Sequence, residues 1–143
     1  MKVFELAIFS YILKQYNTMF KPLLSRYDIT QVEIDILAFL YNNPEYKYAS
    51  DIVKIRCINK GQASIAIDKL VEKGLLQRQA DPQCRRCNLL LLTEASHELI
   101  AQIKAVQTQF KKKIYHEIAD GDKEKFDQIL KQMYLNLGGY NNE

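Results

Sequence analysis

Two arginines stand between two cysteines in the short segment Cys84-Arg85-Arg86-Cys87. Arginine side chains at an exposed tip are suited to contact the phosphates of a nucleic acid. Two cysteines separated by two residues have the spacing of zinc knuckles and of redox pairs. The segment thus has two candidate chemistries, phosphate contact and thiol chemistry, and the surrounding elements decide how it is presented.

The arginines lie in a loop between two strand-like runs. Residues 75–79 and 88–92 are short and rich in leucine, and the loop between them is polar and contains Pro82. Two such runs joined by a proline-bearing loop predict a β-hairpin. We therefore expect Arg85 and Arg86 at the tip of a two-stranded ribbon.

A helix is predicted directly before this hairpin. Asn59 and Gln62 have the spacing of a capped helix start near Lys60, and Gly74 suits a left-handed helix end. Ala63, Ile67, Leu70 and Val71 form the inner stripe, so the remaining residues near the amino end face outward. A helix beside a basic hairpin is typical of a winged helix-turn-helix, in which the helix enters the DNA major groove. The predicted DNA contacts are Lys60, Gly61, Gln62, Ser64, Ile65 and Lys69 on the helix and Arg78, Arg85 and Arg86 on the hairpin.

The rest of the chain is predicted to be helical. Thr30 and Glu33 have capping-box spacing, and this helix stops at Asn42-Asn43-Pro44, before a short helix over residues 49–56. Residues 3–20 carry a wide helical stripe, Pro22 predicts a break at Lys21, and residues 23–27 are expected to form a short turn. Further helices are predicted after Glu94, with Thr93 as a possible cap, and from a capped start at Asp120-Gly121-Asp122.

These elements predict a mostly α fold with a small β-hairpin wing. Residues 29–93 are expected to form the winged helix-turn-helix domain, and residues 1–28 and 94–143 a helical dimerisation region. The outer segments have wide apolar stripes and little within one chain to bury them, which favours a homodimer.

Composition agrees with a soluble globular protein. The chain has 143 residues, of which 48% are hydrophobic and 26% charged, and no apolar run is long enough to cross a bilayer. We expect a cytoplasmic protein that contacts no membrane. The net charge is only +3, yet residues 50–93 hold eight bases and four acids, a local charge of +4. The positive excess therefore lies where phosphate contact is predicted.

The sequence resembles the MarR family of bacterial transcription regulators, most strongly over residues 30–93. The likeness rests on Leu70 with Glu72-Lys73-Gly74-Leu75 at the helix end, on the basic Arg78, and on the wing tip Asp81-Pro82-Gln83-Cys84-Arg85-Arg86. In two places the chain departs from the family pattern: Cys84 replaces a second aspartate at the tip, and Ile65 stands where an arginine is common. Ile65 is instead suited to a thymine methyl group.

The resemblance implies a homodimer that occupies a pseudo-palindromic double-stranded operator. It also implies a cleft for a small aromatic ligand, for which Tyr11, Tyr16 and Tyr27 are candidates; the simpler interpretation of these tyrosines is core packing. Binding of such a ligand would favour a dimer with the wrong spacing for DNA.

The three cysteines leave several alternatives open. An odd number without a secretion signal makes a disulfide framework improbable, so free thiols are expected, with Cys57 as a small apolar filler. Zinc lacks enough ligands beside Cys84 and Cys87. The two arginines favour thiolates at these positions, so a redox pair whose disulfide distorts the wing is the better alternative.

We therefore predict a DNA-binding transcription regulator. It is expected to act as a repressor that a small ligand or an oxidant releases from its operator. No enzyme motif, cofactor or metal site is predicted. The alternatives are a winged helix that serves as a protein-interaction scaffold, and a dedicated thiol or metal sensor.

Overall fold

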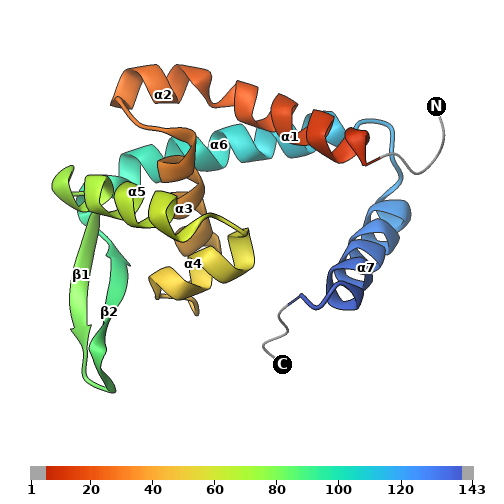
Figure 1. Ribbon diagram of the computed structural model, residues 1–143. Coiled ribbons are helices and arrows are strands. Elements are labelled where there is room, and N and C mark those ends of the chain that lie inside the picture. The colour runs from red at the N-terminus through yellow and green to blue at the C-terminus, as the bar shows by residue number, and fades with distance from the viewer. Residues whose placement is uncertain (1–5, 140–143) are drawn as a thin grey trace. The chain divides into compact units, whose positions relative to one another are not determined.

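The computed structural model describes residues 6–139, which form two compact units, residues 6–110 and 111–139 (Figure 1). The helices and strands in chain order are α1 (Ala7–Met19), α2 (Lys21–Tyr27), α3 (Gln31–Asn42), α4 (Ala49–Arg56), α5 (Lys60–Glu72), β1 (Leu76–Asp81), β2 (Cys84–Leu92), the 3₁₀ turn η1 (Glu94–Ser96), α6 (His97–Ile114) and α7 (Asp120–Asn136). The predicted fold class, mostly helical with one small hairpin, is confirmed.

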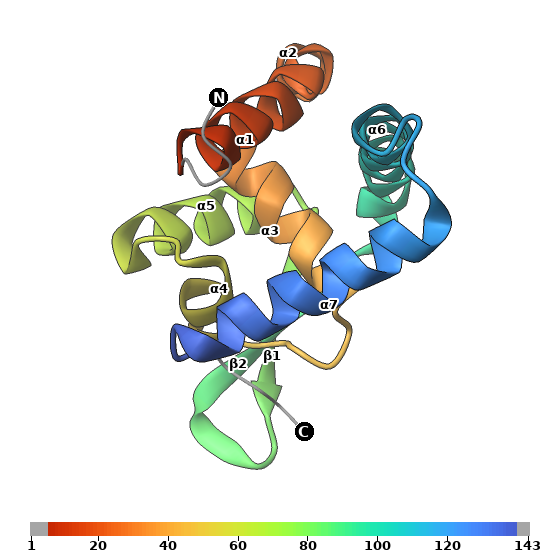
Figure 2. The same ribbon diagram turned by 90° about the vertical axis from the view of Figure 1, so that its right-hand side faces the viewer.

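The core of the first unit is built around α3. Ile34, Ile36 and Leu37 are fully buried, and α5 packs beside this helix, as Figures 1 and 2 both show. The core cluster takes at least one buried apolar side chain from each of α2 to α6 and from both strands. Burial of a large aliphatic side chain is worth about 1.5–3 kcal/mol, so this cluster fixes where α5 lies.

The start of α3 is the capping box that the sequence predicts. The Thr30 hydroxyl oxygen accepts from the Glu33 amide at 3.3 Å, and Glu33 Oε2 accepts from the Thr30 amide at 2.9 Å. Two amides of the first turn, which have no partner within the helix, are thereby satisfied.

The two strands form an antiparallel hairpin, which we call the wing together with the turn at Pro82 and Gln83. Its register runs from the pair Leu76 and Leu92 to the pair Ala80 and Asn88. The wing projects from the rest of its unit beside α5 (Figure 1). The predicted hairpin is confirmed, and its strands extend further toward the tip than the apolar runs indicated.

Two predictions on the first helices need comment. The break near Pro22 is confirmed, because α1 ends at Met19, while residues 3–5 of the predicted helix lie outside the described residues. The short turn over residues 23–27 is wrong: α2 begins at Lys21 and runs to Tyr27. Pro22 lies in the first turn of α2, where a helix needs no amide donor and proline is tolerated.

The second unit contains the end of α6 and the whole of α7. The residue before α7 is Ala119, which forms no side-chain cap, so the prediction of a capped start at Asp120 is wrong in that detail. Phe126, Ile129 and Leu137 are exposed at 45%, 48% and 89%. Across residues 6–139, the helices lack the length and apolar character needed to span a membrane.

Candidate nucleic-acid interface

The sequence places α5 with one apolar and one polar face. Ala63, Ala66, Ile67 and Leu70 are buried against the core, which adds Ala66 to the predicted stripe and leaves Val71 half-buried. All six residues predicted to contact DNA from this helix are exposed: Lys60, Gly61, Gln62, Ser64, Ile65 and Lys69. Ile65 is 60% exposed, although burial would stabilise such a side chain, so it is available to a partner surface.

The amino end of α5 is capped as predicted. The Asn59 side-chain oxygen accepts from the amides of Gly61 at 2.8 Å and Gln62 at 3.4 Å. This cap begins the helix at Lys60, so the exposed residues of its first two turns lie together at the end that a recognition helix presents to bases.

The carboxyl end of α5 is held by a buried charge. Lys73 donates to Glu33 Oε2 at 3.1 Å and to the carbonyl oxygen of Asp28, and Glu33 is fully buried. Gly74 follows with φ of +71°, and the Leu75 amide donates to the Leu70 carbonyl at 2.9 Å. The predicted left-handed helix end is thus confirmed, and it is tied to the start of α3.

Arg78 connects the wing to α5. Its guanidinium forms an ion pair with Asp68, which lies on the outer face of α5. The structure therefore gives this residue a protein partner in addition to the predicted DNA contact, which stays a prediction. The ion pair links β1 to α5.

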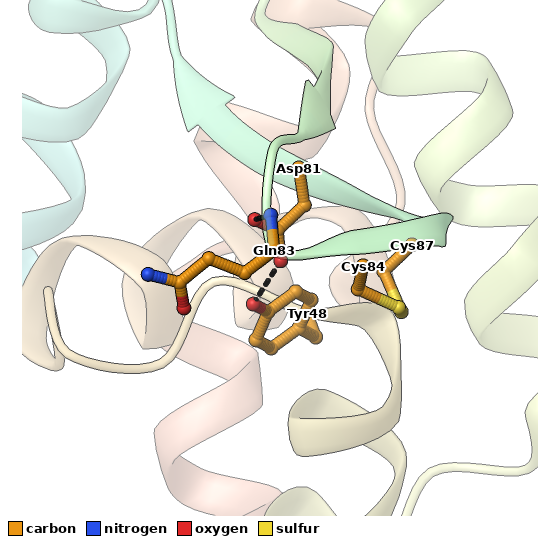
Figure 3. The surroundings of a disulfide bond; sticks show 5 residues. All are labelled: Tyr48, Asp81, Gln83, Cys84 and Cys87. Carbon is orange, nitrogen blue, oxygen red and sulfur yellow. Dashed lines mark hydrogen bonds between the residues drawn. A yellow bond between two sulfur atoms is a disulfide. The ribbon is translucent and has the colours of Figure 1, made fainter.

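The tip of the wing is held at Asp81. The Tyr48 hydroxyl donates to Asp81 Oδ2 at 2.5 Å, and the Gln83 amide donates to Asp81 Oδ1 at 2.9 Å (Figure 3). The bond from Tyr48, helped by the Gln83 amide, lowers the pKa of the Asp81 carboxyl below its usual value. The same bond raises the pKa of the Tyr48 phenol, because its proton is held by the carboxylate.

Cys84 and Cys87 are joined by a disulfide, with their Cα atoms 5.3 Å apart (Figure 3). The expectation of free thiols at these two positions is therefore wrong. Two residues of separation are enough for a disulfide where the strand is locally folded, which a sequence pattern does not reveal. Cys57 is free, but it is exposed with φ of +52°, so its prediction as a core filler is wrong too.

A cleft of about 490 Å³ lies between α4, α5 and the wing. We call it the wing cleft. Its wall includes Lys60 and Ser64 of α5 together with Arg78 and Arg86 of the wing. Arg85 and Arg86 are both exposed. Four of the nine residues that the sequence assigned to one interface thus lie in the wall of one cleft. The other five are exposed but do not line it: Gly61, Gln62, Ile65, Lys69 and Arg85.

The three tyrosines predicted to line a ligand pocket do not share one cavity. Tyr11 is 63% exposed, and Tyr27 exchanges hydrogen bonds with α6 through Glu98 and Gln102. Tyr16 lines a polar cavity of about 110 Å³, and neither of the other two tyrosines is in its wall.

The cavity beside Tyr16 has charged groups in its wall. Asp35 lies 3.7 Å from the Arg56 guanidinium, and burial raises the pKa of the Asp35 carboxyl, opposed by a hydrogen bond from Gln31. The Tyr16 hydroxyl accepts from Gln107 at 3.0 Å, and burial raises its pKa. The cavity is therefore polar.

Sequence reasoning missed Tyr48, Asp81, Glu33 and Lys73 as residues that position the interface. Tyr48 and Asp81 are 33 residues apart, and Glu33 and Lys73 are 40 apart, so no local pattern links them. Lys73 directly before Gly74 at a helix end was the one available signal, because a base there suits the helix dipole. Within the described part of the chain, no group of three or more His, Cys, Asp and Glu side chains is arranged to hold a metal ion.

Comparison with known proteins places this arrangement in context. Residues 27–86 match the model of the MarR family. The chain is similar to the structure of a MarR-family transcriptional regulator from Listeria monocytogenes complexed with 26mer DNA, at 17% identity, with 100% of each chain covered and a TM-score of 0.82. It is also similar to S. aureus MepR in a DNA-binding conformation, at 20% identity over 92% of this chain and 96% of that one, with a TM-score of 0.82.

A third similar structure is a MarR transcriptional regulator from Methanosarcina mazei Go1. The identity is 23%, over 91% of this chain and 93% of that one, and the TM-score is 0.75. At these identities the likeness to the three structures is one of fold, and the segment that matches the family model contains α3 to α5 and the wing as far as Arg86.

Proposed function

We propose that the chain is a transcription regulator of the MarR family, whose model residues 27–86 match, and that it is a sequence-specific repressor that binds double-stranded operator DNA as a homodimer. The observation that carries the proposal is the wing cleft, in whose wall exposed residues of α5 and arginines of the wing lie together. A winged helix that reads DNA needs this arrangement, with the helix in the major groove and the wing against the adjacent backbone or minor groove.

We assign separate roles to the exposed residues of α5. Gln62 lies in the first turn and has an amide that can form two hydrogen bonds with adenine, and Ile65 suits the methyl group of thymine. Lys60, Ser64 and Lys69 contact phosphates or base edges on either side, and the close backbone at Gly61 allows the helix to approach the DNA. Arg85 and Arg86 extend the contact along the duplex, with Arg78 behind them. Two of the similar structures are a complex with 26mer DNA and a protein in a DNA-binding conformation, which supports this use of the fold.

A second copy of the chain is part of the proposal. Apolar side chains of α1 and of the residue before it are exposed in the first unit: Leu6 at 70%, Phe9 at 41% and Leu13 at 56%. In the second unit the exposed apolar residues of α7 present a comparable surface. We propose that residues 1–28 and 94–143 bury these surfaces between two copies, and that residues 29–93 form the DNA-binding domain. Two-fold symmetry then sets the two α5 helices about 34 Å apart on a pseudo-palindromic site.

Release from DNA by a small aromatic ligand or an oxidant completes the proposal. The cavity beside Tyr16 measures about 110 Å³, below the roughly 300–1,000 Å³ of ordinary ligand pockets, so a ligand there must enlarge it or use surface from the second copy. Such a ligand lowers DNA affinity only to the extent that it binds the dimer conformation unable to bind DNA more tightly than the conformation that binds DNA.

The test is selection of bound duplexes from a random pool, repeated at two salt concentrations. We expect an enriched inverted repeat with half-site centres about 10 base pairs apart, and an affinity that falls steeply with salt. Sedimentation of the complex should give two chains per duplex. A protein-interaction scaffold predicts no salt-sensitive duplex binding, and that result, with no enriched sequence, would overturn the proposal.

A further inference from the structure

The ladder of the wing is interrupted where the arginines lie. Five successive pairs join Leu76–Ala80 with Asn88–Leu92, but the next residue of β1, Asp81, pairs with Cys84. One step along β1 thus corresponds to four steps along β2, and residues 85–87 lie outside the ladder as a bulge. The disulfide between Cys84 and Cys87 spans this bulge.

The disulfide and an unbroken β2 strand exclude each other. Three steps along an extended strand cover about 10 Å, whereas disulfide-bonded residues keep their Cα atoms within about 7 Å. The measured Cα separation is 5.3 Å. Without the bond, the existing register can continue, which pairs Asp81 with Cys87 and Pro82 with Arg86. Residues 83–85 then form a three-residue connection, a common hairpin length.

We propose that Cys84 and Cys87 form a redox-active pair that switches the wing between these two registers. In the oxidised wing the end turn consists of Pro82 and Gln83, and the arginines are set back on the bulge. In the reduced wing Arg85 enters the end turn and Arg86 becomes the last paired residue. Reduction therefore moves both charges to the end of the wing that meets DNA, and oxidation weakens DNA binding. The inference rests on the proposed function for its effect on affinity, but not for the change of register.

The chemistry needs only a peroxide and a dithiol. Both cysteines are half-buried, so small reagents reach them, and the neighbouring guanidinium groups favour their thiolates. One thiolate attacks a peroxide oxygen, the O–O bond breaks, a sulfenic acid forms, and the leaving hydroxide takes the proton of the second thiol and becomes water. The second thiolate attacks the sulfenic sulfur, the S–S bond forms, and a second water leaves. Two thiols and hydrogen peroxide thus give one disulfide and two waters. An added dithiol regenerates the two protein thiols by thiol–disulfide exchange and is itself oxidised to a disulfide.

The base of the wing stays fixed in both registers. Asp81 keeps its place on β1 and its bond from Tyr48, and the Leu90 amide donates to the Lys47 carbonyl at 2.7 Å. The Arg78–Asp68 ion pair lies on the same side of the interruption. The change is therefore confined to residues 82–87, and the rest of the unit need not unfold.

The experiment uses the full chain, oxidised with hydrogen peroxide or reduced with dithiothreitol, with the thiol count checked by mass spectrometry. Amide hydrogen exchange of residues 84–88 is measured in both states without DNA. Affinity for the selected duplex is then measured in both states at two salt concentrations. The variant Cys84→Ser/Cys87→Ser tests the pair, and Cys57→Ser is the matched control, since Cys57 is exposed and free.

We expect slower exchange over residues 84–88 in the reduced state, and DNA affinity at least about tenfold higher than in the oxidised state, with a steeper salt dependence. The double variant should bind like the reduced protein and ignore peroxide, while Cys57→Ser should respond like the unaltered chain. Identical exchange in both states, or a peroxide response that survives in the double variant, overturns the switch. Loss of duplex binding in both states with a clear exchange difference overturns the proposed function and leaves the register change standing.

Discussion

Helix α5 and the tip of the wing belong to one proposed interface but are held in place by different means. Buried residues such as Ile67 and Leu70 fix α5 against the core, and its two ends are held by Asn59 and Lys73. Beyond Ala80 the wing has no apolar core, and its tip is held by the bond from Tyr48 and by one disulfide. The helix is therefore positioned by many shared contacts, whereas the tip depends on two links that chemistry can alter without unfolding the protein.

The largest expected effect is at the carboxyl end of α5, where Lys73 pairs with the buried Glu33. Lys73→Met removes the cation beside Glu33, which is fully buried and then lacks its ionic partner. Breaking a buried ion pair by removing one partner costs about 3–5 kcal/mol, and the partial exposure of Lys73 points to the lower end of this range. Chemical denaturation should show a loss of about 3 kcal/mol in the free energy of unfolding.

The matched control is Lys69→Met, an exposed base four residues earlier on the same helix, which should change stability by less than about 0.5 kcal/mol. The double variant Glu33→Gln/Lys73→Met should recover part of the loss, since glutamine can still accept from the Thr30 amide. Equal stability of Lys73→Met and Lys69→Met would remove the buried pair from the account of how α5 is held.

A second prediction concerns what α5 reads. Gln62→Ala removes an exposed amide while keeping a good helix former, so the fold should be retained. We expect the variant to lose about 1–3 kcal/mol of discrimination at one adenine of each half-site, measured by competition among duplex variants. Glu72→Ala, at the other end of the helix, is the control and should keep the preference. An unchanged base preference in Gln62→Ala would exclude this residue from base reading.

Much of the α5 side of this comparison was predictable. The caps at Thr30 and Asn59 depend on residues two or three positions away, so their spacing identifies both helix starts. The buried stripe of α5 follows from helical periodicity for the same reason. Such signals are local, and they are enough to predict the fold class and the exposed face of α5.

The tip was less predictable, because its links are not local or not specific. The bond from Tyr48 joins residues 33 positions apart, and the spacing of Cys84 and Cys87 fits a metal site, a redox pair or two free thiols equally well. The helix over Lys21–Tyr27 is not predicted for another reason: Pro22 disfavours helix at Lys21, yet proline also favours the first turn of a helix.

A third prediction concerns the contribution of the wing to DNA affinity. Arg86→Ala should weaken duplex binding and reduce the salt dependence by about one unit of slope per lost phosphate contact, with little change in base preference. Measuring affinity at several salt concentrations gives the slope. The control is Arg26→Ala, another exposed arginine, which lies on α2. If both variants kept the slope of the unaltered protein, the wing would play no part in DNA binding.

The smallest expected effect is at Tyr48. Tyr48→Phe removes the hydroxyl that lowers the Asp81 pKa, so this pKa should rise toward its ordinary value of 3.8, which a carbon-13 NMR titration of the carboxyl can follow. A carboxyl whose pKa is lower in the folded state stabilises the protein above the unfolded pKa, and this contribution is lost as pH falls through the folded value. The stability difference between Tyr48→Phe and the unaltered chain should therefore be present at neutral pH and shrink in acid. Tyr41→Phe, which removes a hydroxyl bonded to Lys104 instead, should leave the Asp81 titration unmoved. An Asp81 titration that is the same in Tyr48→Phe as in the unaltered chain would show that this hydroxyl does not hold the carboxylate at the tip.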